Sequence, residues 1–95
     1  MGKAEKLLDK WDGNIPKEAR VRDVETFLNH FFNGMWDQEG SSHIVVRCGA
    51  LMGFPDYQPY GEISVPVKGG KKVKGRYIKS LVRAAHLIQD LEEEL

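Results

Sequence analysis

The feature that most constrains the fold is a change of hydrophobic period in the last third of the chain. From Glu62 to Val67 apolar and polar residues alternate, as in a strand with one buried face. From Tyr77 onward apolar residues recur every three or four positions, which predicts an amphipathic helix. In a chain of 95 residues, this pattern predicts one α+β domain. The helical stripe consists of Tyr77, Leu81, Ala84, Ile88, Leu91 and Leu95.

A second alternating segment, SHIVVRC, places Ile44, Val46 and Cys48 on one side and His43, Val45 and Arg47 on the other. The segment MWDQ predicts a third, short strand, and two amphipathic segments before it predict helices. The expected order is helix, helix, three strands, helix. This order predicts a three-stranded antiparallel sheet with helices packed on one face. The predicted core comprises Ile44, Val46, Ile63, Val65, Leu81 and Ile88.

Charge is balanced overall but segregated along the chain. Fourteen Lys and Arg residues match fourteen Asp and Glu residues, yet no carboxylate lies between Lys68 and Arg83. Cys48 is the only cysteine, which excludes an intramolecular disulfide and a cysteine-built metal site. No apolar run reaches the ~18 residues of a membrane span, and the N-terminus lacks a secretion signal. We therefore expect a cytoplasmic protein.

The basic segment KGGKKVKGR directly precedes the last helix. We expect flexible backbone there, and the free N–H groups and dipole of a helix N-terminus favour anions. The phosphates of RNA are the natural ligand, and the segment lacks the pattern of a nucleotide-binding loop. A solvated charged surface is the other interpretation. The candidate RNA-binding residues in this segment are Lys68, Lys71, Lys72, Lys74 and Arg76.

His43 is predicted on the open face of the sheet, beside Arg47 and Ser64. Histidine exchanges protons near neutral pH, which suits general acid–base catalysis; a plain polar residue on a solvated strand is the alternative. Arg47 joins the candidate RNA-binding residues. We expect no carboxylate cluster on this face, which argues against a metal-dependent nuclease, and we expect no metal or other cofactor. His30 and His86, set within helices, are interpreted as structural.

The loop between the two alternating segments, residues 49–61, is rich in glycine, proline and aromatic residues. Phe54, Tyr57 and Tyr60 would stack on bases or meet a protein partner. Alternatively, they fold back and shield the end of the hairpin.

Two stretches, GSSHIVVR and ISVPVKGGKKVKGRYIKSLVRAAHL, resemble the HicA toxin family of bacterial toxin–antitoxin systems. The family pattern has a glycine and serine before a histidine that opens a strand, then a Val-Pro-like strand end, a Gly-Lys turn and a final helix. The resemblance covers residues 21–87, with 1–14 as an extra N-terminal helix of the same single domain. The matching positions are Gly40, Ser41, His43, Val65, Pro66, Gly70, Lys71, Lys74, Ile78, Leu81 and Ala85.

The resemblance implies a double-stranded-RNA-binding-like fold and degradation of messenger RNA. It assigns His43 as the catalytic histidine, with the turn formed by Gly40, Ser41 and Ser42 supporting it, and it implies a HicB-type antitoxin as partner. The chain departs from the pattern in four respects. Ser42 replaces a second histidine, Tyr77 replaces a common threonine, the loop between strands is longer, and a helix precedes the domain.

Residue chemistry and resemblance both favour metal-independent RNA cleavage, in which the ribose 2′-hydroxyl attacks its own phosphate. This reaction needs a proton-transferring group and positive charge near the phosphorus. Two other interpretations stay open. One is a non-catalytic RNA-binding module of the same fold; the other is an adaptor with the aromatic loop and N-terminal helix as its interface.

Overall fold

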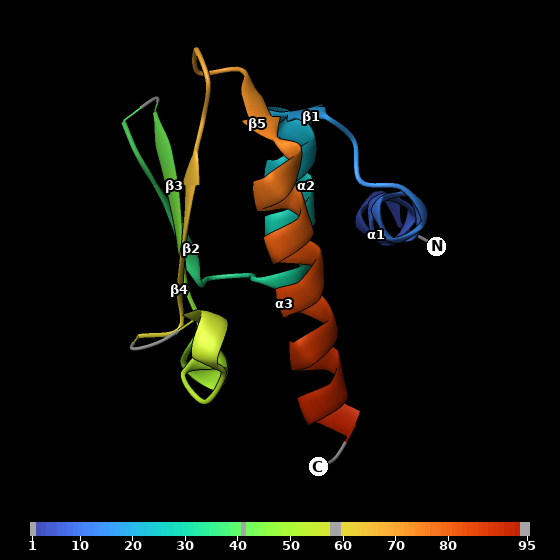
Figure 1. The fold of residues 1–95 in the computed structure, drawn as a ribbon, viewed down its shortest axis with the longest axis vertical. Coiled ribbons are helices and arrows are strands. Elements are labelled where there is room, and N and C mark those ends of the chain that lie inside the picture. Colours follow the sequence, from blue (N-terminus) through green and yellow to red (C-terminus); the bar gives the residue numbers. More distant parts are fainter. Residues whose placement is uncertain (1, 41, 58–59, 94–95) are drawn as a thin grey trace.

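The computed structural model describes residues 2–40, 42–57 and 60–93. Figure 1 shows a three-stranded sheet with helices on one of its faces, which confirms the predicted α+β class. The elements in chain order are α1 (Lys3–Gly13), β1 (Glu18–Arg20), α2 (Val21–Phe31), β2 (Trp36–Glu39), β3 (His43–Arg47), η1 (Gly49–Leu51), η2 (Pro55–Tyr57), β4 (Glu62–Pro66), β5 (Lys72–Lys74) and α3 (Gly75–Glu93).

The main sheet has the strand order β2-β3-β4, and both of its pairings are antiparallel. On β3, Ile44 and Val46 face the helices and are fully buried. They pair with Val65 and Ile63 of β4, which are also buried. The predicted strand faces are thus confirmed, because apolar residues at alternate positions cover one side of a pleated sheet.

A single hydrophobic cluster joins the sheet to all three helices. Helix α1 contributes Trp11, which is 2% exposed and stacks at a tilt on Phe27 of α2, with ring centroids 5.3 Å apart. Five of the six predicted core residues are buried. Ile88 is the exception: it is only partly buried, because α3 continues past the lower end of the sheet (Figure 1). No helix of the described ranges is long and apolar enough to cross a membrane.

The predicted element order omitted a second, two-stranded sheet. Strand β5 pairs antiparallel with β1, with Ala19 opposite Val73 and both side chains buried. The flexible backbone expected through the lysine-rich segment is therefore wrong for Lys72–Lys74, which form β5. Strands of three residues are too short to show a two-residue period, and only the pairing of two such strands reveals them.

The start of α3 is fixed against the segment that links α1 to β1. The Gly75 N–H donates to the Lys17 carbonyl oxygen at 2.9 Å. A Cβ on Gly75 would lie 2.1 Å from the Pro16 carbonyl oxygen, so the close approach of the two backbones requires glycine. This contact sets the position of α3 relative to β1 and β5.

Candidate nucleic-acid interface

His43 is the first residue of β3, the central strand, and its side chain is exposed on the open face of the sheet. The register places it between Glu39 of β2 and Pro66 of β4. Ser42 Oγ lies 3.2 Å from His43 Nδ1, within hydrogen-bond distance of the imidazole. Among the described residues, His43 Nε2 has no hydrogen-bond partner, and this nitrogen is free to meet a substrate.

The turn before β3 holds the three residues that the resemblance assigns to support of His43, and the structure describes two of them. Gly40 adopts a φ of 64°, a left-handed conformation that favours glycine. Ser42 accepts a hydrogen bond from the Val67 N–H at 2.7 Å through its carbonyl oxygen, which ties the turn to the end of β4. Ser41 lies outside the described residues.

Arg47 shares the open face with His43 but occupies the other end of β3, ~13 Å away at the rise of an extended strand. Arg47 Nη2 lies 3.6 Å from Glu39 and its Nε lies 3.3 Å from Glu62. Two carboxylates therefore already neutralise this guanidinium. Glu39 is also the ladder partner of His43, so the Arg47 side chain extends along the open face toward the His43 end of the strand.

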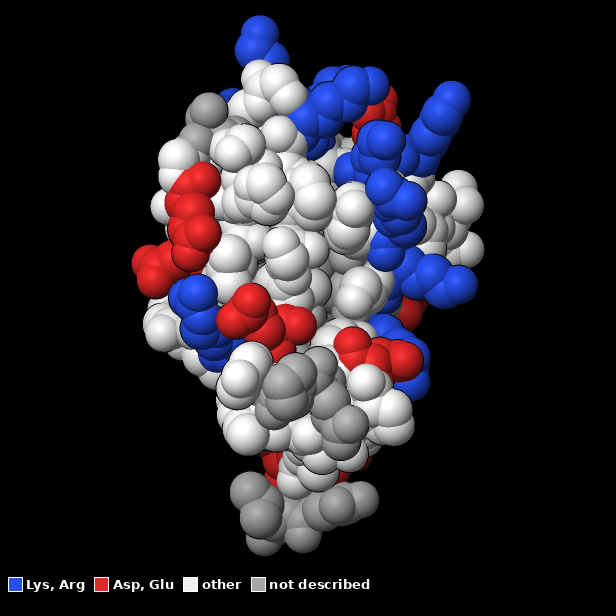
Figure 2. All heavy atoms as spheres, turned by 60° about the vertical axis from the view of Figure 1, so that its left-hand side comes forward, with Lys and Arg blue, Asp and Glu red and all other residues white. Residues whose placement is uncertain are grey.

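The open face, on which we expected no carboxylate cluster, carries three carboxylates. Cross-strand partners share a face, so Asp37, Glu39 and Glu62 lie on the same side as His43. Alternation along β4 already placed Glu62 on this face, whereas Asp37 and Glu39 were not placed because the register of β2 was not assigned from the sequence. No group of three His, Cys, Asp or Glu side chains within the described residues is arranged to hold a metal ion. The acidic side chains are also visible on this face in Figure 2.

The basic segment folds as a tight turn, which we call the lysine hairpin (Lys68–Lys74). The Lys68 N–H donates to the Lys72 carbonyl oxygen at 2.7 Å, and the Lys72 N–H returns a bond of 3.2 Å. Gly69 and Gly70 take φ values of 61° and 71°, which side chains rarely adopt. The turn thus needs both glycines, and it presents exposed lysines on either side of them.

The five candidate cations of the basic segment have no carboxylate within ion-pair distance among the described residues. Glu18 nevertheless lies opposite Lys74 in the ladder between β1 and β5. Three of the five cations line an open cleft of ≈690 Å³ at the start of α3, together with Lys17 and one carboxylate, Glu18. Arg76 also lies over the ring of Tyr77, with Cζ 5.0 Å from the centroid. In Figure 2 most of the Lys and Arg side chains in view form a column at the upper right of the molecule. The three candidate cations that line the cleft at the start of α3 are Lys68, Lys74 and Arg76.

Pairing of β1 with β5 adds two cations that sequence reasoning missed. Lys17 reaches the cleft, and Arg20 lies directly opposite Lys72 in the ladder. Like charges at opposed positions destabilise a strand pair. Asp23 offsets part of this repulsion, since its Oδ2 lies 3.6 Å from Arg20. The only signal in the sequence was EAR, a three-residue segment with no readable period.

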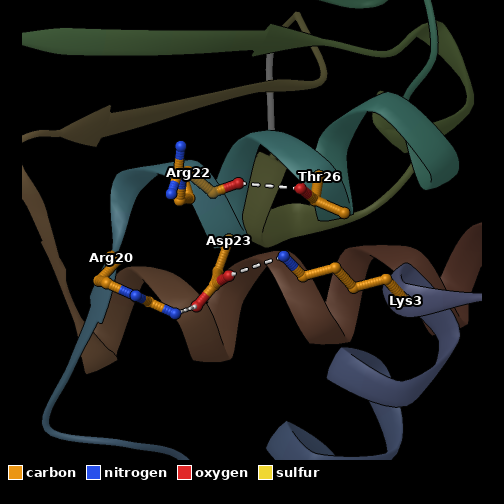
Figure 3. Close-up of polar contacts among 5 residues, drawn as sticks. All are labelled: Lys3, Arg20, Arg22, Asp23 and Thr26. Carbon is orange, nitrogen blue, oxygen red and sulfur yellow. Dashed lines mark hydrogen bonds and ion pairs between the residues drawn. The ribbon is translucent and has the colours of Figure 1, made fainter.

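Asp23 also connects the β1–β5 ladder to α1, as Figure 3 shows. Its Oδ1 lies 3.7 Å from Lys3 Nζ, beyond hydrogen-bond distance. This oxygen is buried and accepts no hydrogen bond from the described residues. In the next turn of α2, the Thr26 hydroxyl donates to the Arg22 carbonyl oxygen at 3.0 Å. Asp23 therefore lies between Lys3 of α1 and Arg20 of β1. The ladder places Arg20 opposite Lys72 of the lysine hairpin.

His43 and the lysine hairpin lie at the same end of the molecule. The partner of His43 across the ladder is Pro66, and the hairpin begins two residues later at Lys68. The Cα atoms of His43 and Lys68 are thus on the order of 10 Å apart. Figure 1 shows the end of β4 and the start of β5 at the upper end, where β3 begins.

The aromatic residues of the loop 49–61 differ in exposure: two shield the end of the hairpin, and one is exposed. Tyr57 is buried, and its hydroxyl donates to the Ser80 carbonyl oxygen of α3 at 3.1 Å. Phe54 is half-buried and packs against the core. Tyr60 is 71% exposed. The first two residues shield the lower end of the sheet, and only Tyr60 is free to contact a ligand.

A scan against protein-family models, a search of curated proteins and a search of solved structures each find no match to the chain. The HicA resemblance and the double-stranded-RNA-binding-like fold therefore stay predictions.

Proposed function

We propose that the chain binds RNA at the end of the molecule that carries the lysine hairpin, and cleaves it with His43. The carrying observation is the exposed imidazole, whose Nε2 has no hydrogen-bond partner among the described residues, at the same end of the molecule as the cations of the lysine hairpin. RNA backbones are polyanions, and Lys and Arg contacts with phosphates supply most of the affinity for them. The lysine hairpin would hold the backbone, and the imidazole would meet the bond to be cut.

The proposed reaction is an internal transfer at phosphorus. The 2′-hydroxyl oxygen bonds to the adjacent phosphorus and loses its proton to a base, while the bond to the 5′ oxygen breaks and that oxygen takes up a proton. His43 would act in one of these proton transfers. Lys68 and Lys71 would stabilise the extra negative charge on the phosphate oxygens. Arg47 is the weaker candidate for that role because Glu39 and Glu62 bind it.

Non-catalytic RNA binding is the alternative, and one observation favours it. No carboxylate within the described residues hydrogen-bonds to the His43 ring, whereas catalytic histidines are commonly oriented by such a group. Binding through the lysine hairpin would not need His43 at all. A HicB-type antitoxin, the partner that the family resemblance implies, would act on the catalytic form by covering His43.

An RNA cleavage assay tests the proposal. Purified protein is incubated with a labelled single-stranded RNA and a labelled duplex RNA in the presence of EDTA, and binding is measured in parallel by fluorescence anisotropy. We expect cleavage with EDTA present. Binding without cleavage would establish the non-catalytic module, and neither binding nor cleavage would leave an adaptor protein. A DNA oligonucleotide of the same sequence is the control, because it lacks the 2′-hydroxyl.

A further inference from the structure

Strand β4 has one edge that no other strand covers among the described residues. The bonds that flank its pairing with β3 run from the Val67 N–H to Ser42 and from the Cys48 N–H to Gly61, at 2.7 and 3.0 Å. Hydrogen-bonded and non-bonded pairs alternate along an antiparallel ladder. The residues of β4 that bond to β3 are therefore Ile63 and Val65.

The other residues of β4 direct their backbone groups away from the sheet. These groups are the N–H and C=O of Glu62 and Ser64 and the C=O of Pro66. Within the described residues, β4 pairs with β3 alone, and none of these outward groups has a hydrogen-bond partner. A free edge of this kind is a template for one more strand.

A groove runs between this edge and α3. It consists of two adjoining hollows of ≈330 and ≈280 Å³ that share Arg76 and Tyr77. Ser64 lines the first hollow and Pro66 the second. Figure 1 shows β4 and α3 side by side along this groove. An added strand would lie against β4 on one side and above the half-buried Tyr77 ring on the other.

The charges around the groove favour an acidic ligand. Lys68, Lys74 and Arg76 line its upper part, and Lys79 lines a hollow next to its lower part. None of them has an ion-pair partner in the part of the chain that the structure describes. Two carboxylates line the lower hollow, and each is paired with an arginine: Glu62, on the edge itself, lies 3.3 Å from Arg47 Nε, and Asp56 forms an ion pair with Arg83.

The opposite edge of the sheet differs in charge. On β2 the outward backbone groups belong to Trp36 and Gln38, because the Arg47 N–H bonds to the Met35 carbonyl oxygen at 2.7 Å and fixes the alternation. This edge carries Asp37 and Glu39 rather than cations, so it would repel the same ligand.

We propose that the groove binds an extended acidic segment of a partner protein, which adds a fourth strand to the sheet at β4. A polypeptide strand presents N–H donors and C=O acceptors in alternation, as the edge requires. The phosphates of a nucleic acid offer acceptors only, and its backbone does not present amide donors and carbonyl acceptors in the alternation that Glu62 and Ser64 require. This inference does not depend on RNA cleavage, and the two are tested by separate measurements.

Peptide binding to the purified protein provides the test. The probe is a short fluorescein-labelled peptide that alternates Glu and Thr, measured by fluorescence anisotropy. Two matched peptides serve as controls: one has Lys in place of Glu, and one carries N-methyl groups on the backbone amides of one edge. We expect the acidic probe to bind, and each control to bind at least about tenfold more weakly, equivalent to ~1.4 kcal/mol.

Amide hydrogen exchange followed by NMR locates the contact. The acidic probe should slow exchange at Glu62 and Ser64, whose N–H groups point outward, and leave Ile63 and Val65 unchanged. Ser64→Pro removes the central outward N–H without removing a bond to β3, and it should weaken binding by about tenfold or more. Gln38→Pro makes the same change on the β2 edge and should have no effect. The N-methylated peptide gives the same information if Ser64→Pro fails to fold.

Three outcomes would overturn the proposal. One is an absence of probe binding. Another is binding with no slowing at Glu62 and Ser64, which would reduce the effect to general attraction between charges. The third is slowed exchange at Glu62 and Ser64 that is caused by another occupant of the edge. A poly(U) probe that slows exchange at these amides would identify a nucleic acid as the occupant. Slowed exchange in the concentrated protein alone, with dimers seen in sedimentation, would identify a second copy of the chain.

Discussion

His86 Nε2 lies 2.7 and 2.9 Å from the two carboxylate oxygens of Asp12, and this contact joins α3 to α1 across 74 positions of sequence. At its other end, α1 reaches α2 through Lys3 and Asp23, 3.7 Å apart. Between these two polar contacts lie the apolar residues that α1 buries, among them Trp11. The extra N-terminal helix is thus part of the folded domain and not an appendage.

Burial of Trp11, rather than the polar contacts, should hold α1 in place. The Asp12 and His86 side chains are 43% and 44% exposed, and exposed ion pairs contribute at most about 1 kcal/mol. Asp12→Asn should therefore lower the free energy of unfolding by less than ~1 kcal/mol, and Trp11→Ala by ~3–5 kcal/mol. Urea denaturation measures both. Equal losses for the two variants would contradict this ranking.

The burial of Val46 gives a test of the strand faces. Val46 is fully buried in the sheet–helix core, so Val46→Asp places an unpaired charge there at a cost of several kcal/mol. Since small domains have about 5–15 kcal/mol of stability, we expect a largely unfolded protein. Ser64→Asp puts the same charge on the open face and should leave the thermal melt, followed by circular dichroism, within a few degrees. A wild-type melt for Val46→Asp would reverse the assignment of the faces.

Gly75 should tolerate no side chain. Gly75→Ala would force a Cβ against the Pro16 carbonyl oxygen, 2.1 Å away, and we expect the variant to be less stable by ~1–3 kcal/mol as α3 shifts. Gly13→Ala is the matched control, because a Cβ there meets nothing within 4 Å, and it should be neutral or stabilise by ~0.5–1 kcal/mol. Chemical denaturation of the two variants compares them directly. Similar stabilities would mean that the 15–17 segment moves aside at little cost.

The longer elements of the fold could be predicted from the sequence, and the three-residue strands could not. Strand β4 alternates over five residues, and α3 repeats its apolar stripe over several turns, so each pattern is clear in isolation. Strand β3 is less regular, because Val45 on its open face is also buried. Strands β1 and β5 have three residues each and exist only because Ala19 and Val73 meet in the core. That meeting depends on tertiary packing, which local sequence does not record.

The candidate site divides in the same way. Alternation correctly placed His43 and Arg47 on one face, because residues two apart point the same way. What occupies Arg47 depends on the register of β2, which brings Glu39 within 3.6 Å. The approach of Arg20 to Lys72 likewise follows from a pairing between segments about fifty positions apart. Sequence identified the residue types of the site, and strand pairing determined their neighbours.

Neutralising the lysine hairpin should weaken RNA binding and its dependence on salt. With Lys71, Lys72 and Lys74 all changed to Gln, we expect the slope of log K against log salt to fall by ~0.7–0.9 for each phosphate that the protein no longer binds. Lys6→Gln with Lys10→Gln removes exposed charges from α1 and should leave the slope unchanged. Anisotropy titrations at several salt concentrations give the slopes. An unaltered slope in the triple variant would assign these lysines to solvation alone.

His43 is the residue on which catalysis depends in the proposed reaction. Its imidazole is exposed, and its one hydrogen-bond-distance neighbour among the described residues is Ser42, so His43→Ala should leave fold and RNA affinity nearly intact. Removal of a general acid–base group typically slows a reaction ~100- to 10,000-fold, and we expect a decrease in that range for cleavage of labelled RNA in EDTA. His30→Ala removes another exposed imidazole, one that packs edge-on against Phe31, and should cut RNA at the wild-type rate. With circular dichroism confirming the fold, a His43→Ala protein that cuts as fast as the His30→Ala control would exclude His43 from the chemistry.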